Sequence, residues 1–259
     1  MEKTLTLLYH EVTDFPEKTG FQRKSANPYK HPLKEFIAHI DLVKNSGKRV
    51  LTINDYPFNK KEDTIFLTFD DGGKSALQAA DILEEKNMRG HFFITTSMIN
   101  NKYFVNEQDI RELQNRGHII GSHSHSHPNV FKSLSKDKMI SEWRTSKKKL
   151  EDLLGLEITS CSIPGGDANR NTYKTAFDEG YSFVFNSDPS LKIACVEENR
   201  YIIGRVCPKK GKNINQIERY IQFKDIKKEL LTRKVKNNIK TLIFPVYSVI
   251  HNNNKHREG

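Results

Sequence analysis

The stretch TIFLTFDDG, residues 64–72, decides the fold class. Its first six residues are apolar or β-branched, as in a buried strand, and Asp70, Asp71 and Gly72 follow directly. In parallel α/β domains the active site forms at the carboxyl ends of the strands, so chemistry is expected at this edge. Neighbouring side chains of an extended backbone point to opposite sides, so the two carboxylates are expected to take separate roles. One could bind a metal ion and the other could accept a proton.

Short apolar strands alternate with helical patterns along the rest of the chain. In the helical segments, apolar residues recur three or four positions apart. This alternation is typical of parallel βα units and predicts an α/β fold. The expected strands are residues 5–9, 64–69, 92–95, 119–122, 160–163 and 183–185. The expected helices are residues 33–44, 75–86, 106–116, 135–154 and 171–179.

Length and composition are those of an ordinary globular protein. The chain has 259 residues, of which 36% are hydrophobic and 29% charged, which excludes a disordered, collagenous or multi-span membrane protein. We expect one domain over residues 1–259, with its core at 7–206 and a basic helical extension at 208–259. Cys161, Cys195 and Cys207 form no CxxC pair, which argues against a disulfide scaffold and favours a reducing compartment. Because the N-terminal apolar run is short and no cleavage site follows it, a cytoplasmic location is expected.

A second expected strand, residues 119–122, is followed by a histidine-rich run. His123, His125 and His127 fall within five residues, and imidazole is the commonest side-chain metal ligand. In a helical turn, positions four apart lie on one side, so His123 and His127 would point together while His125 points elsewhere. Two imidazoles and one carboxylate make a three-ligand set with an open position for water, as in catalytic zinc sites.

Both segments also have simpler interpretations. An Asp-Asp-Gly sequence after a strand is most often a turn with a helix cap. A short histidine-rich segment often binds metal without catalysing a reaction. Their coincidence at the ends of two strands of one sheet favours a catalytic metal site.

The net charge of +10 is concentrated toward the C-terminus. Residues 1–207 hold 29 Lys and Arg against 28 Asp and Glu, whereas residues 208–259 hold 13 against 4. Within this basic region Leu231, Val235 and Ile239 recur four apart and would share one side of a helix. Such a helix either contacts an anionic membrane or packs on the domain with a solvated lysine face, the commoner arrangement. Nucleic-acid binding is not expected, because aromatic residues are not regularly interleaved with the lysines.

Four motifs together resemble a known family. The string TFDDG and the later HSHSHP resemble the polysaccharide deacetylases of carbohydrate esterase family 4, the NodB-homology proteins. The opening YHEV and the segment SIPGGDANRN, residues 162–171, resemble the exopolysaccharide-locus branch of that family. The resemblance extends from about Leu7 to Val206 and implies a distorted (β/α) barrel.

The resemblance also implies roles for the residues of the first two motifs. Asp70 would be the general base, and Asp71, His123 and His127 would bind a divalent metal, with Zn²⁺ expected. Ser124 would support the loop through hydrogen bonds. Gly165, which follows the motif proline, would donate its backbone N–H to the oxyanion.

The later motifs depart from the family's pattern. Ser162 stands where the third motif normally has an arginine that hydrogen-bonds the catalytic aspartate. The only tryptophan, Trp143, lies in an expected helix instead of in the substrate groove. The general acid of the fifth motif has one late candidate, His251, although His10 at the end of the first strand could also line the pocket. His10, Pro164 and Ser162 are the expected substrate-binding positions.

The expected function is a metal-dependent deacetylase acting on N-acetyl groups of a cell-surface or exopolysaccharide sugar, or of its lipid-linked precursor. Contact with an anionic membrane through the basic C-terminal region would suit such a precursor. One alternative is an amide hydrolase of the same fold with a small non-glycan substrate, which a small, closed pocket would favour. Another is a non-catalytic carbohydrate-binding protein. A glycan groove should bring Tyr173, Phe131 or Phe104 near the metal.

Overall fold

The computed structural model describes residues 2–58 and 62–235. Its strands are β1 (Thr4–Tyr9), β2 (Glu11–Val12), β3 (Lys30–His31), β4 (Arg49–Val50), β5 (Thr64–Phe69), β6 (His91–Ile94), β7 (Ile119–Ser122), β8 (Ser160–Ser162), β9 (Phe183–Phe185), β10 (Ile193–Glu197) and β11 (Arg200–Ile203). Its helices are α1 (Leu33–Asn45), α2 (Ala76–Glu84), α3 (Glu107–Asn115), α4 (Lys136–Leu154), α5 (Arg170–Asp178) and α6 (Ile214–Ile221).

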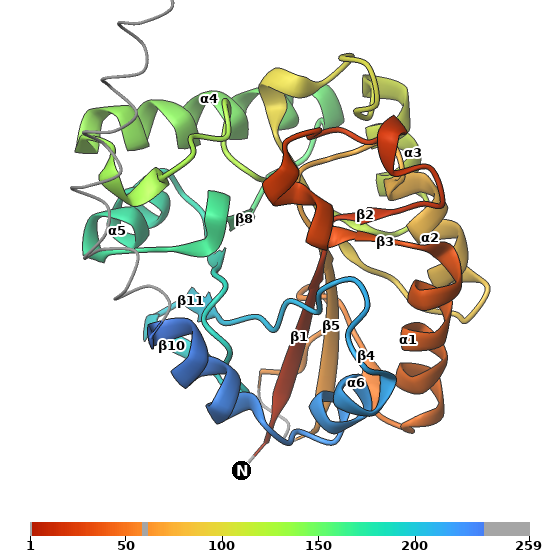
Figure 1. The fold of residues 1–259 in the computed structure, drawn as a ribbon. Helices are drawn as coiled ribbons and strands as arrows, with labels where there is room; N and C mark the ends of the chain where they lie inside the picture. The colour runs from red at the N-terminus through yellow and green to blue at the C-terminus, as the bar shows by residue number, and fades with distance from the viewer. Residues whose placement is uncertain (1, 59–61, 236–259) are drawn as a thin grey trace, which may run out of the picture.

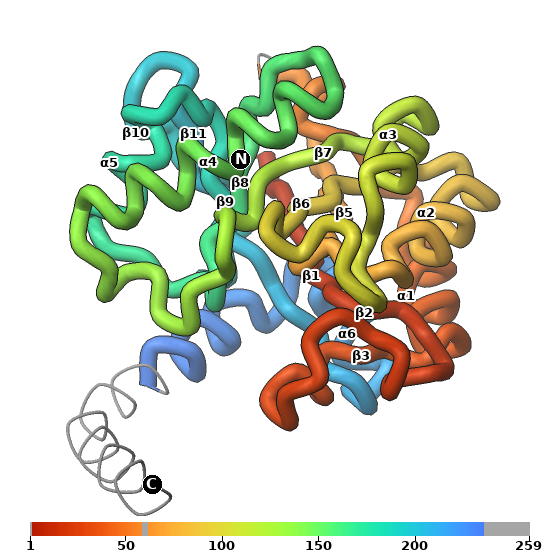
Figure 2. Tube along the Cα trace, turned by 90° about the horizontal axis from the view of Figure 1, so that it is seen from above, coloured from red at the N-terminus to blue at the C-terminus, as the bar shows by residue number. Residues whose placement is uncertain are grey.

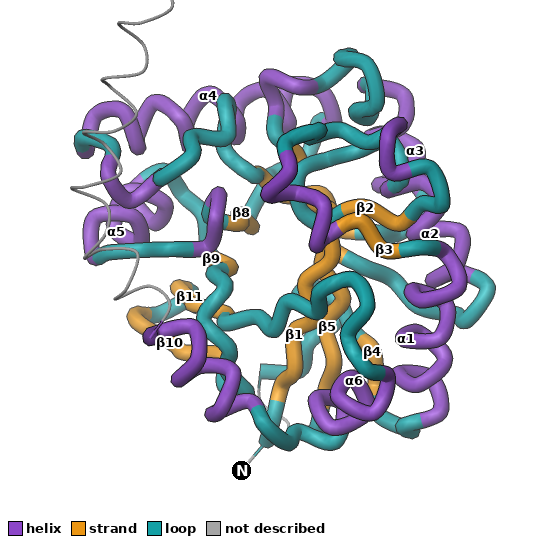
Figure 3. Tube along the Cα trace, viewed as in Figure 1, coloured by secondary structure: helices purple, strands orange, loops and turns teal. Residues whose placement is uncertain are grey.

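Nine of the described strands form one curved sheet that nearly closes into a barrel (Figure 1), and β2 and β3 pair in a separate two-stranded sheet. The strands of the curved sheet follow one another in the order β1-β5-β6-β7-β8-β9-β11-β10, and β4 pairs with β5 off this path. Within the described sheet, the β10–β11 pair is antiparallel and the other pairs are parallel. Helices surround this sheet (Figures 2 and 3). The expected distorted (β/α) barrel is confirmed.

The barrel closes where the chain beyond β11 returns to β1. Val206 forms a parallel bridge with Leu7. The Leu8 N–H donates to the Val206 carbonyl, and the Val206 N–H donates to the Thr6 carbonyl, both at 2.8 Å. This seam places the residue before it, Arg205, inside the barrel, where its side chain is 0% exposed.

The core packs between the sheet and the outer helices. Phe69 stacks on Phe92 with ring centroids 4.7 Å apart. Trp143 of α4 is fully buried against Phe131 and Tyr181, which confirms its expected place in a helix. The three cysteines are free, as their spacing predicts.

Side-chain caps explain where the outer helices begin. Asn106 and Asn169 each accept from a backbone N–H three residues on, which completes a capping box for α3 and α5. Ser135 caps α4 in the same way. α4 ends at Gly155, whose φ of 67° is the left-handed conformation that glycine adopts without steric cost.

The expected strands and helices agree with the structure to within a few residues. The short strands β2, β3, β4, β10 and β11 were not expected, and helix α6 lies within the expected helical extension, residues 208–259. Within residues 2–58 and 62–235, no helix combines the length and apolar character that crossing a bilayer requires.

Candidate active site

A cavity of about 140 Å³ lies at the carboxyl ends of the strands. The two expected carboxylates follow β5, and the two expected imidazoles follow β7. All four side chains reach this cavity, as does a turn that follows β8. Its lining includes His10, Phe21, Arg23, Tyr29, Asp70, Asp71, His123, His127, Gly165, Gly166, Cys207 and Arg233.

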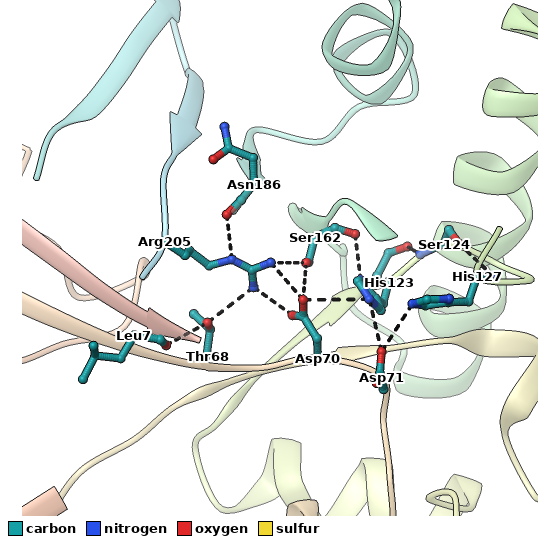
Figure 4. A network of polar contacts seen from close by, with 11 residues as sticks. Leu7, Thr68, Asp70, Asp71, His123, Ser124, His127, Ser162, Asn186 and Arg205 are labelled. Carbon is teal, nitrogen blue, oxygen red and sulfur yellow. Dashed lines mark hydrogen bonds and ion pairs between the residues drawn. The ribbon is translucent and has the colours of Figure 1, made fainter. Parts of the chain in front are cut away.

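One carboxylate oxygen lies between two imidazole nitrogens (Figure 4). Asp71 Oδ1 is 3.4 Å from His123 Nε2 and 3.4 Å from His127 Nε2. The three ligand atoms lie within 4.8 Å of one another. A tetrahedral zinc ion with bonds of roughly 2.0–2.1 Å holds neighbouring ligand atoms about 3.4 Å apart. The spacing of these donors therefore fits a small divalent cation.

The hydrogen bond on the far side of His123 prepares its ring as a metal ligand. Its Nδ1 lies 2.9 Å from the Ser162 carbonyl oxygen. A carbonyl only accepts, so Nδ1 carries the proton and Nε2 can offer its lone pair to a cation. His125 instead bonds Thr96 Oγ1 at 3.0 Å and lies outside the ligand set, as expected.

The local backbone that brings these donors together differs from the expected helical turn. Asp71, Ser124 and His127 have φ values of 78°, 62° and 54°, so the chain curls tightly after both β5 and β7. The Ser124 hydroxyl oxygen accepts from the His127 N–H at 3.2 Å, which confirms its supporting role. Left-handed residues in the two loops, instead of helical spacing, aim the side chains at one point.

The charges of this cluster favour a bound cation. Burial alone would raise the pKa of Asp71, but hydrogen bonds from His123 and His127 hold it well below its usual range. Burial lowers the pKa of His123, whereas Asp70 and Asp71 raise it, and the net pKa is raised. Two ionised carboxylates therefore face the imidazoles, and their combined field attracts a divalent ion.

The other carboxylate, Asp70, is held by an arginine that the sequence motifs did not indicate (Figure 4). Arg205 Nη1 and Nη2 donate to Asp70 Oδ1 and Oδ2, each at 2.8 Å. Arg205 also donates to Ser162 Oγ at 2.7 Å and to the Asn186 carbonyl at 2.9 Å. Ser162 Oγ in turn donates to Asp70 Oδ2 at 2.9 Å. The carboxylate is thus fixed by three donors.

This environment keeps Asp70 ionised. Burial would raise its pKa, but the Arg205 guanidinium, with His123 and His10, lowers the pKa below its ordinary value. Asp70 Oδ2 lies 3.8 Å from His123 Nε2. An ionised acceptor therefore lies beside the metal-ligand set and can take a proton from water there.

Arg205 supplies to Asp70 the guanidinium that the third motif lacks. Ser162 replaces the arginine expected at that position, and its small side chain leaves room for the guanidinium of Arg205 from another strand. A weak signal was present in the sequence, because Arg205 follows an apolar run and Gly204, as residues at strand ends often do. The register that brings it to Asp70, across 135 residues, could not be read from the sequence.

His10, at the end of β1, is the imidazole that the structure places in the cavity beside the metal-ligand set. Its ring packs against Tyr29 with centroids 4.8 Å apart. Among the described residues, its buried Nδ1 has no hydrogen-bond partner. Burial lowers the pKa of His10, and the carboxylates of Asp71 and Asp70 partly oppose this effect.

The remaining expected site residues fall into three groups. Gly165 lines the cavity and has a φ of 69°. Ser162 and Pro164, two expected substrate-binding positions, are buried and do not belong to the cavity lining, and Ser162 donates to Asp70. His251, the expected general acid, lies outside the described residues.

The aromatic lining also differs from the expected one. Phe131 packs on Trp143, and neither Tyr173 nor Phe104 lines the cavity. The lining rings are instead Phe21, which packs against His127 with centroids 4.8 Å apart, and Tyr29. Both belong to the segment between β2 and β3, whose contribution the sequence pattern did not indicate.

Comparison with known proteins agrees with this site. The family model for polysaccharide deacetylases matches residues 58–184, which contain the residues of the ligand set. YxkH of Bacillus subtilis (strain 168) is 27% identical over 223 residues, covering 83% of this chain and 75% of its own length. The peptidoglycan-N-acetylglucosamine deacetylase of Bacillus cereus is 30% identical over 130 residues, 49% of this chain and 45% of its own. The crystal structure of BC0361, a polysaccharide deacetylase from Bacillus cereus, superposes with a TM-score of 0.72 at 21% identity, covering 85% and 69% of the two chains.

The barrel and the carboxylate-imidazole site define a hydrolase that acts on N-acetyl amide bonds. The chain contains a polysaccharide deacetylase domain, matched over residues 58–184, and has the NodB-type fold of carbohydrate esterase family 4.

Proposed function

We propose that this protein removes N-acetyl groups from a cell-surface glycan or exopolysaccharide, using a divalent metal ion, Zn²⁺ in the first instance. The observation that carries the proposal is the arrangement of Asp70. An ionised carboxylate, clamped by Arg205, lies 3.8 Å from the nitrogen that His123 offers to a cation. A general base beside a three-donor metal set is one arrangement that can hydrolyse an unactivated amide.

Asp71, His123 and His127 would hold the cation. When bound, it would polarise the acyl oxygen and make water more acidic, and so ease attack on the amide. The rest of the chemistry belongs to the protein's own side chains and backbone.

Asp70 accepts a proton from the attacking water as the water oxygen bonds to the acyl carbon. The backbone N–H of Gly165, on the cavity wall, donates to the acyl oxygen as negative charge develops there. The carbon–nitrogen bond then breaks, and the departing nitrogen takes a proton. Acetate and a free amine on the sugar are the products.

His10 is the proton donor that the geometry favours. It lines the same cavity as Asp70, and its burial lowers its pKa, so its protonated form gives up a proton more readily. It replaces His251 in this proposal because His10 is placed at the site. A proton donor in the same cavity as the base suits a reaction in which one group takes a proton and another returns one.

The proposed substrate is a polymer or a lipid-linked precursor of which the acetamido group enters the cavity. A cavity of about 140 Å³ admits an acetamido group and part of a ring, so the rest of a glycan would lie at the mouth. The cytoplasmic, membrane-peripheral location is part of the same proposal, and cell fractionation tests it.

A second candidate is hydrolysis of a small non-glycan amide. The confined cavity, together with the absence of the expected aromatic residues from its lining, favours this alternative. A small N-acetylated amine therefore belongs in the assay beside the glycans.

The decisive experiment measures acetate release after chelation and restoration of zinc or cobalt. The substrates are N-acetylglucosamine oligomers, an O-acetylated glycan and a small N-acetylated amine. Asp70→Asn should abolish release while retaining metal, whereas Asp71→Asn should lose the metal. Asp178→Asn, an exposed partner of Lys174, is the matched control and should behave as wild type.

Release from the oligomers that needs both the metal and Asp70 supports the proposal. Release from the small amine alone supports the second candidate. If every substrate fails while metal binds normally, the glycan proposal is refuted for these linkages.

A further inference from the structure

Residues 226–235 form a helix at the edge of the barrel, with one side packed on the domain (Figure 1). Ile226 is buried at 5% exposure. Glu229 pairs with Lys212 at 3.2 Å, and Arg233 pairs with Asp188 at 2.9 Å. The apolar and charged residues on this inner side of the helix therefore attach it to the domain.

The outer side of this helix carries aliphatic and basic residues together. Leu231 and Val235 are 63% and 55% exposed. They therefore do not pack on the domain, although packing there is the commoner arrangement for such helices. At 100° per residue they lie on one line, with Lys228 on one side and Lys227 and Lys234 on the other. All three lysines are exposed.

The inner side joins this helix to the mouth of the active site. Arg233 lines the same cavity as His10. Arg233 also donates to Asp167 Oδ1 at 2.6 Å, and Asp167 directly follows the Gly165–Gly166 turn. A helix is about 10 Å across, so a surface touching its outer side would lie about that far from the cavity mouth.

We propose that the outer side of helix 226–235 binds the surface of an anionic lipid bilayer and so holds the cavity mouth beside the membrane. Two aliphatic side chains flanked by lysines match the boundary between acyl chains and anionic headgroups. This deepens the proposed function and rests on it for the inference that the substrate is presented at a membrane.

The bilayer is favoured over other occupants by the combination of charges and apolar groups. A polyanion in solution would be attracted by the lysines but would leave Leu231 and Val235 in water. A second copy of this chain would bring three like charges against three others, which opposes pairing. The basic sequence continues beyond the described residues, with Lys236 and Lys240, so the positive charge along the chain does not end at Val235.

The test is co-sedimentation of the full-length chain with vesicles of phosphatidylcholine, with and without phosphatidylglycerol, at low and high salt. Replacing Lys227, Lys228 and Lys234 by Gln should weaken binding to the anionic vesicles about 100-fold, at about 1 kcal/mol for each lysine. Leu231→Ser with Val235→Ser should weaken binding by about tenfold. The matched controls are Val196→Ser, 52% exposed on β10, and Lys138→Gln on α4, and both should bind as wild type.

The remaining outcomes each overturn the proposal. Failure of wild type to sediment with anionic vesicles does so directly. If only the lysine variant loses vesicle binding, and its retention on heparin falls in parallel, the result indicates general attraction to polyanions. A change of mass in light scattering for the Leu231 and Val235 variant indicates a second copy on this face. Asp70→Asn should bind vesicles normally, so a failure of the catalytic proposal is distinguishable from a failure of this one.

Discussion

Replacing Arg205 by Met should both destabilise the protein and shift the pH range in which it works. The guanidinium and the Asp70 carboxylate form two hydrogen bonds of 2.8 Å with no solvent contact at the arginine. Two charges about 4 Å apart at an effective dielectric constant of about 20 interact by about 4 kcal/mol. Removing one partner of such a pair lowers the free energy of unfolding by about 3–5 kcal/mol, because the other charge stays buried.

The effect on catalysis has a definite sign. Arg205 lowers the pKa of Asp70, so without it burial raises that pKa and less of the base is ionised at a given pH. The acidic limb of kcat/KM should therefore move to higher pH. At neutral pH the rate should fall about 10- to 100-fold and recover partly in alkali.

The assay is acetate release as a function of pH, with thermal unfolding measured on the same samples. Arg200→Met is the matched control, since Arg200 lies nearby on β11 in a partly exposed pair with Glu197 that contributes little. Ser162→Arg combined with Arg205→Ser should restore part of the activity by supplying a guanidinium from the third motif. An acidic limb unchanged in Arg205→Met would refute the tuning of Asp70 by this arginine.

Three further predictions follow from the site. His10→Asn should lower kcat about 100-fold without changing metal content, which elemental analysis checks, and an unchanged kcat would remove His10 as the proton donor. Gly166→Ala should lower the free energy of unfolding by about 2 kcal/mol or more in chemical denaturation, because the new Cβ would lie 1.9 Å from Ser187 Oγ at a φ of 71°. The depressed pKa values of Asp70 and Asp71 contribute stability that is fully present above about pH 4 and lost as pH falls through the folded-state values. Acid titration should therefore show a loss of stability that is smaller in Asp70→Asn, and equal curves would contradict this assignment.

The sequence was most informative where local pattern and site chemistry coincide. β5 and β7 are found where their apolar runs predict them, and the residues after each strand reach one cavity. The three expected metal ligands lie together because the parallel strands of one sheet end at the same edge. The positions of these strands along the chain follow from short-range pattern, and the edge at which their residues meet follows from the parallel α/β fold class, so both could be predicted.

The parts that the sequence did not predict depend on long-range register or on loops. Arg205 reaches Asp70 only because Val206 pairs with β1. Phe21 and Tyr29 reach the cavity through a segment with little regular structure, which no hydrophobic period indicates. Whether Leu231 faces the domain or solvent depends on which side of its helix packs on the domain. A four-residue spacing of apolar residues does not say which side that is.

The seam between β1 and Val206 also gives the site an order of assembly. Asp71 and His127 are separated by 56 residues, since 127 − 71 = 56, and all the ligand-set residues lie in the first half of the chain. Asp70 and Arg205 are 135 residues apart, and loop-closure entropy makes such distant contacts slow to form. The pairing of Asp70 with Arg205 therefore requires closure of the barrel, whereas the contacts among the ligand-set residues span a shorter stretch of chain.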